Sequence, residues 1–382
     1  MQFEGNGVTT RIWILRHGRS TLNDAQTFQG CGAQSELTDE GMRSAQAAGE
    51  RLRGEGIEVI YASPLRRASQ SAELVRATLQ ADGQEPQLET DAALREMELP
   101  GWEGLRYEAV RQHDAEKYRQ FRESPANFSL RDPALGEVWP VLELEQRVHR
   151  FLSTIVRKDA GKNILLVTHG GPASILLLAA LRLPVRCFHA VQVMHGGLSC
   201  VSVQRWPDRM KVEVLNEIGH LDADLPKLKE GKSGLRLLLV ASDASECHIE
   251  LEEPLAQMLE RLPIHRALAA DHDGVITAMR LLKYRRRSTI ETCTATGLRS
   301  AVDRQLIRQR PDELVNMLIT GRGELLSAVV KRAMRWDEMD TPTSLDTCLG
   351  LTIVHLARAS EQPVLQAVNT YRMAGATAGG MA

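Results

Sequence analysis

The chain begins with a regular alternation of apolar runs and amphipathic stretches. Arg11–Leu15 is apolar and stops at Arg16-His17-Gly18, a pattern typical of a buried strand that leads into a polar loop. Thr38–Leu52 has helical periodicity, and Thr38 is placed to cap that helix. Ile57–Ala62 predicts a second strand. Ser63-Pro64 predicts the start of another helix, since proline fits a helix's first turn.

The same alternation returns after residue 160. Asn163–Thr168 predicts a strand, His169–Gly171 a turn, and Pro172–Leu183 a helix. Strands that alternate with helices predict an α/β fold with a largely parallel sheet, and such sheets collect ligands at the carboxyl ends of their strands. Because His17 and His169 both fall at such ends, we expect the chemistry there.

The second half of the chain resembles the first. A polar segment with Pro and Gly, 222–234, predicts a linker between a first domain, 1–221, and a second, 235–382. NMLITGRGELLSAVVKRAM from Asn316 resembles NILLVTHGGPASILLLAAL from Asn163, and a one-residue gap in the match places Gly321 opposite His169. LGLTIVHL from Leu349 resembles GGLSCVSV at nearly the same offset. The matches predict a tandem duplication; the alternative is that amphipathic α/β segments look alike.

Composition excludes several classes of partner. The 382 residues carry a formal net charge of −2 and only 4% aromatic residues, so neither a nucleic acid nor a membrane is expected as a partner. The six cysteines are scattered, and the first ten residues have no apolar signal region. The expected location is the cytoplasm, or the plastid stroma if the chain is a mature plant protein.

Four short motifs carry candidate chemistry, namely RHG, SPLRRA, LRE and THGG. A neutral His17 could attack phosphorus without a metal. Arg16 and Arg67 would supply guanidinium groups that match phosphate geometry, and His169 would add a donor. Glu96 is the candidate acid that protonates the leaving oxygen.

Each motif is weak by itself. A loop histidine is usually only solvated, the arginine pair could be a helix surface, and Glu96 has other acids nearby. The four motifs in this order, each after a strand or in its loop, favour a phosphoryl-transfer site. We expect no metal ligands and no cofactor.

The segment from Arg11 to about Leu221 resembles the histidine phosphatase superfamily, also called phosphoglycerate mutase-like. The resemblance rests on LRHGRSTLN, LTDEG, SPLRRASQSA, LREMELPGWEG and VTHGG. It implies a three-layer sandwich with a mostly parallel central sheet and a phosphohistidine at His17. It also implies a phosphate pocket of Arg16, Arg67 and His169, with Asn23 nearby, and Glu96 as acid and base.

The chain departs from the family pattern at two positions. Arg19 stands where Glu or Gln is usual, and His195 where a small polar residue is more frequent. Arg19, His195, Asn23 and Gly170 are candidate substrate-binding residues. A surface role remains open for Arg19, and a core or rim role for His195. In the second domain Ser242 stands in the position of His17, and Gly321-Arg322 in that of His169-Gly170, so that domain is expected to be non-catalytic.

The expected function is hydrolysis of a small phosphate ester. ESPANF and WPVLELEQR resemble the insert of tandem-domain 2-carboxy-D-arabinitol-1-phosphatase-like proteins, which implies a sugar-acid or carboxylate-bearing substrate. The alternatives are a phosphoserine phosphatase, a cofactor-dependent phosphoglycerate mutase, and a scaffold that only binds phosphorylated ligands. The sequence leaves a homodimer open.

Overall fold

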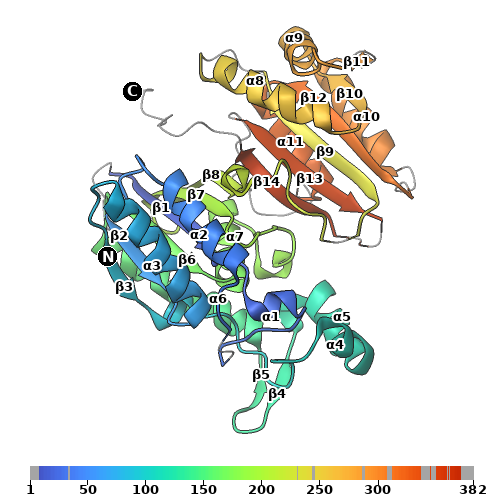
Figure 1. Ribbon diagram of the computed structural model, residues 1–382. Helices are drawn as coiled ribbons and strands as arrows, with labels where there is room; N and C mark the ends of the chain where they lie inside the picture. Colours follow the sequence, from blue (N-terminus) through green and yellow to red (C-terminus); the bar gives the residue numbers. More distant parts are fainter. Residues whose placement is uncertain are drawn as a thin grey trace. The chain divides into compact units, whose positions relative to one another are not determined.

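The computed structural model describes residues 8–32, 35–229, 231–242, 246–285, 289–307, 312–336, 345, 350–358, 360 and 362–370. The chain forms two compact units, Met1–Val212 and Glu213–Ala382 (Figure 1). The division falls inside strand β8, Arg209–Glu217. The expected division into 1–221, 222–234 and 235–382 stays a prediction.

The first unit is built on a sheet whose strands run in the order β3-β2-β6-β1-β7, followed by β8. The strands are β1 (Thr10–Arg16), β2 (Val59–Ala62), β3 (Gln87–Thr90), β6 (Asn163–Thr168) and β7 (Leu198–Arg205). β1, β6, β2 and β3 are parallel, whereas β7 pairs with β1 antiparallel. Because Arg16 is paired with Thr168, His17 and His169 leave neighbouring strands side by side.

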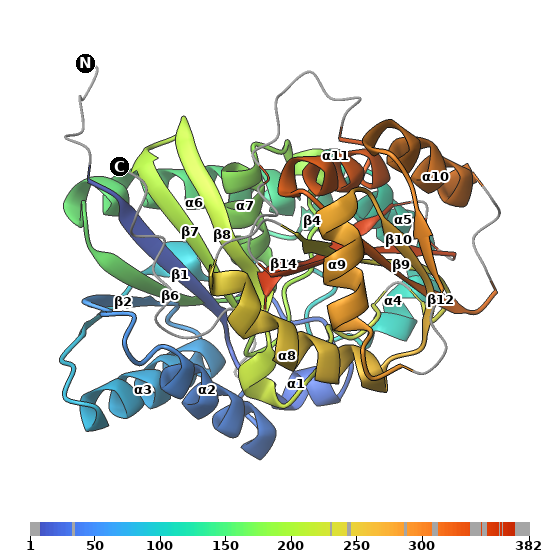
Figure 2. The ribbon, with the colours of Figure 1, turned by 90° about the horizontal axis from the view of Figure 1, so that it is seen from above.

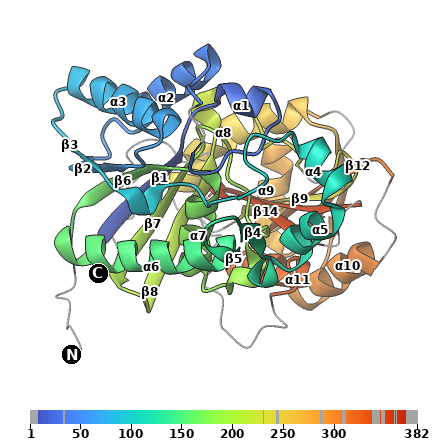
Figure 3. The same cartoon turned by 90° about the horizontal axis from the view of Figure 1, so that it is seen from below.

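Helices cover both faces of this sheet. α2 (Asp39–Arg51) and α3 (Arg66–Ala81) lie on one face, and α6 (Pro140–Lys158) and α7 (Gly170–Leu181) on the other (Figures 2 and 3). Burial from both sides explains why the central strands are apolar throughout rather than alternating. The expected three-layer α/β fold with a mostly parallel sheet is confirmed.

Most element boundaries agree with the sequence pattern. Thr38 caps α2 by accepting a hydrogen bond from Gly41 N at 3.1 Å, and β6 has the predicted limits. α7 begins two residues earlier than predicted, because Pro172 is accommodated in the first turn, where backbone N–H groups lack helical partners. α3 begins only at Arg66, after extended backbone at Leu65.

A long insertion between β3 and α6 packs near the end of β1. It contains η1 (Ala92–Leu94), α4 (Tyr107–His113), α5 (Ala115–Glu123), η2 (Pro125–Asn127), β4 (Leu130–Asp132) and β5 (Gly136–Val138). Its buried Trp102 lies 5.2 Å from the Phe28 ring, centroid to centroid. Phe28 N also donates to Leu105 O at 2.9 Å. The insertion is thereby tied to the loop that follows His17, which includes α1 (Thr21–Asp24).

The second unit repeats this architecture. Its strand order, β14-β13-β9-β12-β10-β11, matches β8-β7-β1-β6-β2-β3 position by position. The strands are β9 (Gly234–Ala241), β10 (Ile264–Ala269), β11 (Ile290–Thr292), β12 (Leu314–Gly321), β13 (Leu351–Ala357) and β14 (Val364–Thr370). The helices are α8 (Glu246–Arg261), α9 (His272–Leu281), α10 (Ala295–Ile307) and α11 (Gly323–Ala333). Figure 2 shows α8 and α9 on one face of this sheet, and α10 and α11 on the other.

The strand register corrects one detail of the sequence alignment. Ala241 pairs with Gly321 just as Arg16 pairs with Thr168, and Arg322 caps α11 as His169 caps α7. Arg322, rather than Gly321, therefore occupies the position of His169. The sequence comparison misplaced it because a gap in this short match could be drawn at more than one residue.

Candidate active site

His17 lies at the end of β1 and is 3% exposed. Its Nδ1 lies 2.7 Å from Gly18 O, and its Nε2 accepts a hydrogen bond from Arg67 Nε at 3.3 Å. A carbonyl oxygen only accepts and a guanidinium only donates, so Nδ1 carries the proton and Nε2 carries the lone pair. The imidazole therefore presents a nucleophilic nitrogen on the side of Arg67.

The surroundings keep His17 neutral. Its pKa is well below the usual 6.5, first because burial disfavours the charged ring, and then because Arg67 and Arg16 repel a further positive charge. A ring without a proton on Nε2 is the form that can attack an electrophile. The two arginines thus favour the nucleophilic state of His17 even before an anion binds.

The two arginines come from different elements. Arg67, on the first turn of α3, is 1% exposed and also donates from Nη2 to Gly30 O at 3.3 Å. Arg16, on β1, donates from Nη1 to Val193 O at 2.8 Å. Burial lowers the pKa of both groups, while the negative charge of Glu96 opposes that effect. Two guanidinium groups held beside a neutral imidazole are suited to bind a phosphate.

His169 is fully buried, with its ring centroid 5.0 Å from that of His17. Its Nε2 lies 2.8 Å from Ser63 Oγ, and that hydroxyl oxygen already accepts from Leu65 N at 3.3 Å. When the hydroxyl donates its proton to Nε2, the ring proton of His169 lies on Nδ1. Burial lowers the pKa of His169 well below 6.5, and His17 and the arginines lower it further. His169 can thus donate one hydrogen bond through Nδ1.

Glu96 follows the short helix η1 and its carboxylate reaches the first turn of α7. Met97 N donates to Oε1 at 2.9 Å, and Gly171 N donates to Oε2 at 3.2 Å. A Cβ atom at Gly171 would lie 2.2 Å from Oε1, so a side chain there would displace the carboxylate. The glycine pair after His169 therefore makes room for the candidate acid.

The glycine after His17 is required by close packing against α2. A Cβ atom at Gly18 would lie 2.2 Å from Gly41 O, and one at Gly41 would lie 2.0 Å from Arg19 O. Gly18 N also donates to Ser71 Oγ at 3.1 Å. The RHG and LTDEG motifs are therefore two sides of one backbone contact that fixes the nucleophile.

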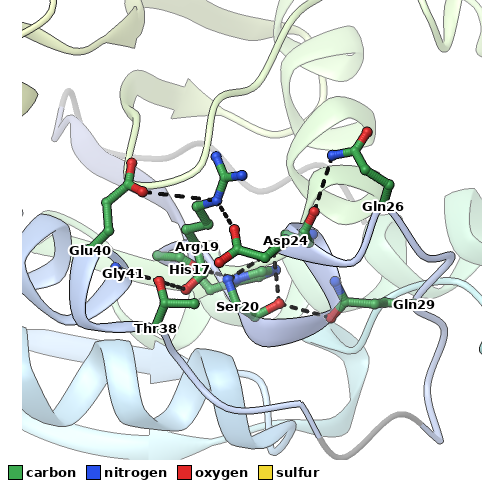
Figure 4. A network of polar contacts seen from close by, with 11 residues as sticks. His17, Arg19, Ser20, Asp24, Gln26, Gln29, Thr38, Glu40 and Gly41 are labelled. Carbon is green, nitrogen blue, oxygen red and sulfur yellow. Dashed lines mark hydrogen bonds and ion pairs between the residues drawn. The ribbon is translucent and has the colours of Figure 1, made fainter.

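The four residues expected to contact substrate occupy different positions. Asn23 is buried, and its Oδ1 accepts from Ser20 N at 3.1 Å and from Ser20 Oγ at 2.8 Å. Arg19 forms ion pairs with Asp24 and Glu40 near the surface (Figure 4). His195 lies beside the nucleophile, with ring centroids 5.6 Å apart, and a Cβ atom added at Gly170 would lie 3.4 Å from Arg16 Cζ.

Three contributors were not identified from the sequence. Ser63 Oγ is the hydrogen-bond partner of His169 Nε2, although SPLRR suggested only a helix start. Arg147 donates to the carbonyl oxygens of Arg95 and Glu96, across a separation in sequence that no local pattern reveals. Burial raises the pKa of Tyr107, Arg16 lowers it and Glu96 raises it, which places this side chain in electrostatic range of both.

The described residues contain no group of three or more His, Cys, Asp or Glu side chains arranged to hold a metal ion. Within the same part of the chain, no helix has the length and apolar character needed to cross a membrane. Among the described residues, Cys31, Cys187, Cys200 and Cys293 are not in disulfides.

The corresponding edge of the second unit has other residues. Ser242 N donates to Gly321 O at 2.9 Å, as His17 N donates to Thr168 O. Asp271 caps α9 by accepting from Gly274 N at 2.7 Å, and its other oxygen accepts from Arg322 N at 3.2 Å. A carboxylate thus lies against the first residues of α9 and α11. In the described segment 289–307, only two residues separate β11 from α10, so the insertion that carries Glu96 has no counterpart.

The model of the histidine phosphatase superfamily (branch 1) matches residues 12–218, more than half of the chain. A probable 2-carboxy-D-arabinitol-1-phosphatase of Arabidopsis thaliana is 29% identical over 191 residues, which cover 50% of this chain and 37% of that protein. The chain thus spans well under two thirds of this relative's length. A probable phosphoglycerate mutase GpmB of Yersinia pestis (strain Pestoides F) is 29% identical over 223 residues, 58% of this chain and 98% of that one.

Among solved structures, YhfR of Bacillus stearothermophilus is 28% identical, with a TM-score of 0.49. The superposition covers 56% of this chain and 99% of that protein.

Proposed function

Because the chain belongs to the histidine phosphatase superfamily (branch 1), we propose that its first unit is a phosphoric monoester hydrolase that works through a phosphohistidine at His17. The observation that carries the proposal is the state of His17: a buried, neutral imidazole whose Nε2 lone pair lies beside the Arg67 guanidinium. Such a group is a nucleophile that already lies next to a positive charge able to bind an incoming phosphate.

The first step forms a bond between His17 Nε2 and phosphorus and breaks the bond from phosphorus to the ester oxygen. Arg16, Arg67 and the Nδ1 proton of His169 bind the equatorial oxygens, where charge collects in the transition state. Protonated Glu96 gives its proton to the leaving oxygen. The products of this step are an alcohol and phosphohistidine.

The second step returns the enzyme to its starting state. Glu96, now a carboxylate, accepts a proton from a water molecule as the water oxygen attacks phosphorus. The bond from Nε2 to phosphorus breaks, inorganic phosphate leaves, and Glu96 is protonated again. Since protein groups and water supply every proton and charge in these steps, we expect activity to survive EDTA.

For the substrate we propose a small ester that also bears a carboxylate, such as a sugar-acid phosphate. The support is the name of the Arabidopsis relative and the extent of the match to it. A phosphoglycerate mutase is the second candidate, because the GpmB protein is matched over 98% of its length. In a mutase, phosphohistidine would return its phosphate to a substrate hydroxyl instead of to water.

The test is phosphate release, in EDTA, from 2-carboxyarabinitol 1-phosphate, phosphoserine, 3-phosphoglycerate and sugar phosphates. We expect turnover of at least one ester by the wild type and none by His17→Ala. Equal release by both proteins would refute the phosphohistidine pathway. Turnover of 3-phosphoglycerate only with 2,3-bisphosphoglycerate, and without phosphate release, would identify a mutase.

A further inference from the structure

The segment that carries Glu96 is held by side chains rather than by regular secondary structure. It runs from the end of η1 through Arg95 and Glu96, which lie outside every helix and strand. Its three successive carbonyl oxygens nevertheless all accept hydrogen bonds from side chains. Thr168 Oγ1 donates to Leu94 O at 2.7 Å, and Cys31 Sγ donates to Glu96 O at 2.7 Å.

Arg147 makes the contact that joins these carbonyls. Its Nη2 donates to Arg95 O at 2.5 Å and to Glu96 O at 3.0 Å. A cationic donor makes stronger hydrogen bonds than a neutral one, and two successive carbonyls bound to one nitrogen fix the orientation of the peptide between them. That peptide determines the direction in which the Glu96 side chain leaves the backbone.

The support for Arg147 is itself rigid. The side chain extends from α6, a 19-residue helix, between the buried residues Leu144 and Val148. At the other end of Glu96, the carboxylate accepts hydrogen bonds from Met97 N and Gly171 N, the second of which lies in the first turn of α7. A shift of about 1 Å in the backbone at Glu96 would therefore break these contacts, and errors of that size lower rates on the order of 100-fold.

We propose that Arg147 is a positioning residue, which holds the backbone at Glu96 so that the carboxyl group can protonate the leaving oxygen. The inference rests on the proposed function, because it assigns a purpose to Arg147 only if Glu96 is the acid. Arg147 touches no reacting atom. Its effect should therefore depend on how much the leaving group needs a proton.

The leaving group separates this role from general support of the fold. The leaving group of an alkyl ester such as phosphoserine is a strongly basic alkoxide, which needs the proton. The leaving group of p-nitrophenyl phosphate is p-nitrophenolate, a weak base that departs without one. If the Glu96 carboxyl group is misplaced, kcat/KM should therefore fall for the alkyl ester alone. Damage to the phosphate pocket or to folding would lower kcat/KM for both esters.

The experiment compares Arg147→Met and Arg147→Lys with Arg150→Met, which removes an exposed arginine one turn along α6. The substrates are p-nitrophenyl phosphate and the best alkyl ester of the panel. We expect Arg147→Met to lower kcat/KM at least about 10-fold for the alkyl ester, which is part of the 10²–10⁴-fold that general acid catalysis contributes. For the aryl ester, we expect the same variant to lower kcat/KM less than about 3-fold. Arg147→Lys should recover part of the loss, because its ammonium is still a cationic donor but lacks the planar guanidinium.

Inhibition by inorganic phosphate supplies the binding readout, and its Ki should stay within about 2-fold in every variant. Equal losses with both esters, or a large rise in the Ki, would refute the positioning role. If Arg147→Met fails to fold, Arg147→Lys should still show a smaller loss confined to the alkyl ester, and its absence would also refute the role. A wild type inactive on both esters would instead refute the proposed function.

Discussion

At the scale of single residues, the first unit controls the protons on its two central imidazoles by directional partners. Gly18 O and Arg67 Nε fix the proton of His17 on Nδ1, and the Ser63 hydroxyl, when it donates to Nε2, holds that of His169 on the same ring atom. One ring therefore presents a lone pair and the other a proton. A phosphoryl group between them would meet a nucleophile and a donor at once.

Removal of the Ser63 hydroxyl should weaken this arrangement. Ser63→Ala leaves His169 Nε2 buried without its donor, so the ring is free to move its proton from Nδ1 to Nε2. We expect kcat/KM to fall about 10-fold, equivalent to about 1.4 kcal/mol, the value of one good hydrogen bond. Steady-state kinetics measure the loss. Ser69→Ala, in the following helix, is the matched control and should retain wild-type kcat/KM.

The buried imidazoles also make stability depend on pH. Because burial holds the pKa of His17 and His169 well below 6.5, the unfolded chain binds protons below about pH 6.5 that the folded chain does not. The free energy of unfolding should therefore fall as the pH drops from 7 to 5. Urea titrations at several pH values measure the slope, which should be smaller in a His17→Gln/His169→Gln double variant. A slope as steep as that of the wild type would contradict this cause, and the exposed His149→Gln serves as control.

At the scale of elements, the contact between the loop after β1 and the first turn of α2 fixes the nucleophile. Gly18 and Gly41 bring two backbones so close that neither position can hold a Cβ atom without movement. Thr38 supports the same turn, since it caps α2 and its Oγ1 also donates to Arg19 O at 3.2 Å. The two motifs are distant in sequence but form one structural joint.

Substitutions at this joint should destabilise the first unit. Gly18→Ala and Gly41→Ala each force backbone atoms apart, and overpacking of this kind costs about 1–3 kcal/mol. Thermal or urea unfolding measures the loss. Gly219→Ala is the control, because a Cβ there meets nothing within 4 Å, and it should change stability by less than about 0.5 kcal/mol. An effect at Gly18 no larger than at Gly219 would mean that the joint is not tightly packed.

The elements also show where sequence patterns are informative. The apolar run of β6 and the Thr38 cap are local signals, and both were predicted at the right residues. The start of α7 was missed because the helix accommodates Gly170 and Gly171, which ordinarily favour a turn. The contact of Arg147 with Arg95 and Glu96 could not be predicted, since it depends on how α6 packs and not on any local sequence.

At the scale of the whole molecule, two units share one strand order but differ at the edge where chemistry would occur. The first has His17, Arg67 and the insertion with Glu96. At the positions of His17 and His169 the second has Ser242 and Arg322, and Asp271 lies where helix N-termini could otherwise hold an anion. The sequence repeat predicted the loss of the histidines, whereas the placement of Asp271 required the strand register.

Substitutions at equivalent positions of the two units should therefore differ in effect. We expect Ser242→Ala and Arg322→Ala to retain turnover within about 2-fold, while His17→Ala and His169→Ala lose at least about 100-fold. The reason is that only the first unit has an imidazole nucleophile beside an arginine. Phosphate release on one substrate compares the four variants. A loss in Ser242→Ala similar to that in His17→Ala would show that the second unit takes part in catalysis.

Strand β8 has a practical consequence for any attempt to dissect the chain. Its second half belongs to the fold of the second unit: Asn216 Nδ2 donates to Gln366 O at 2.7 Å, and Asn369 Nδ2 donates to Glu213 O at 3.2 Å. In a fragment that ends at Leu221, the part of β8 that contains the buried Leu215 would lose its partner strand β14. In the remaining fragment, β14 would lose β8 and become an exposed edge strand. Separately expressed halves should aggregate on this account, and co-expression of complementary fragments is the safer route to a catalytic half that can be studied.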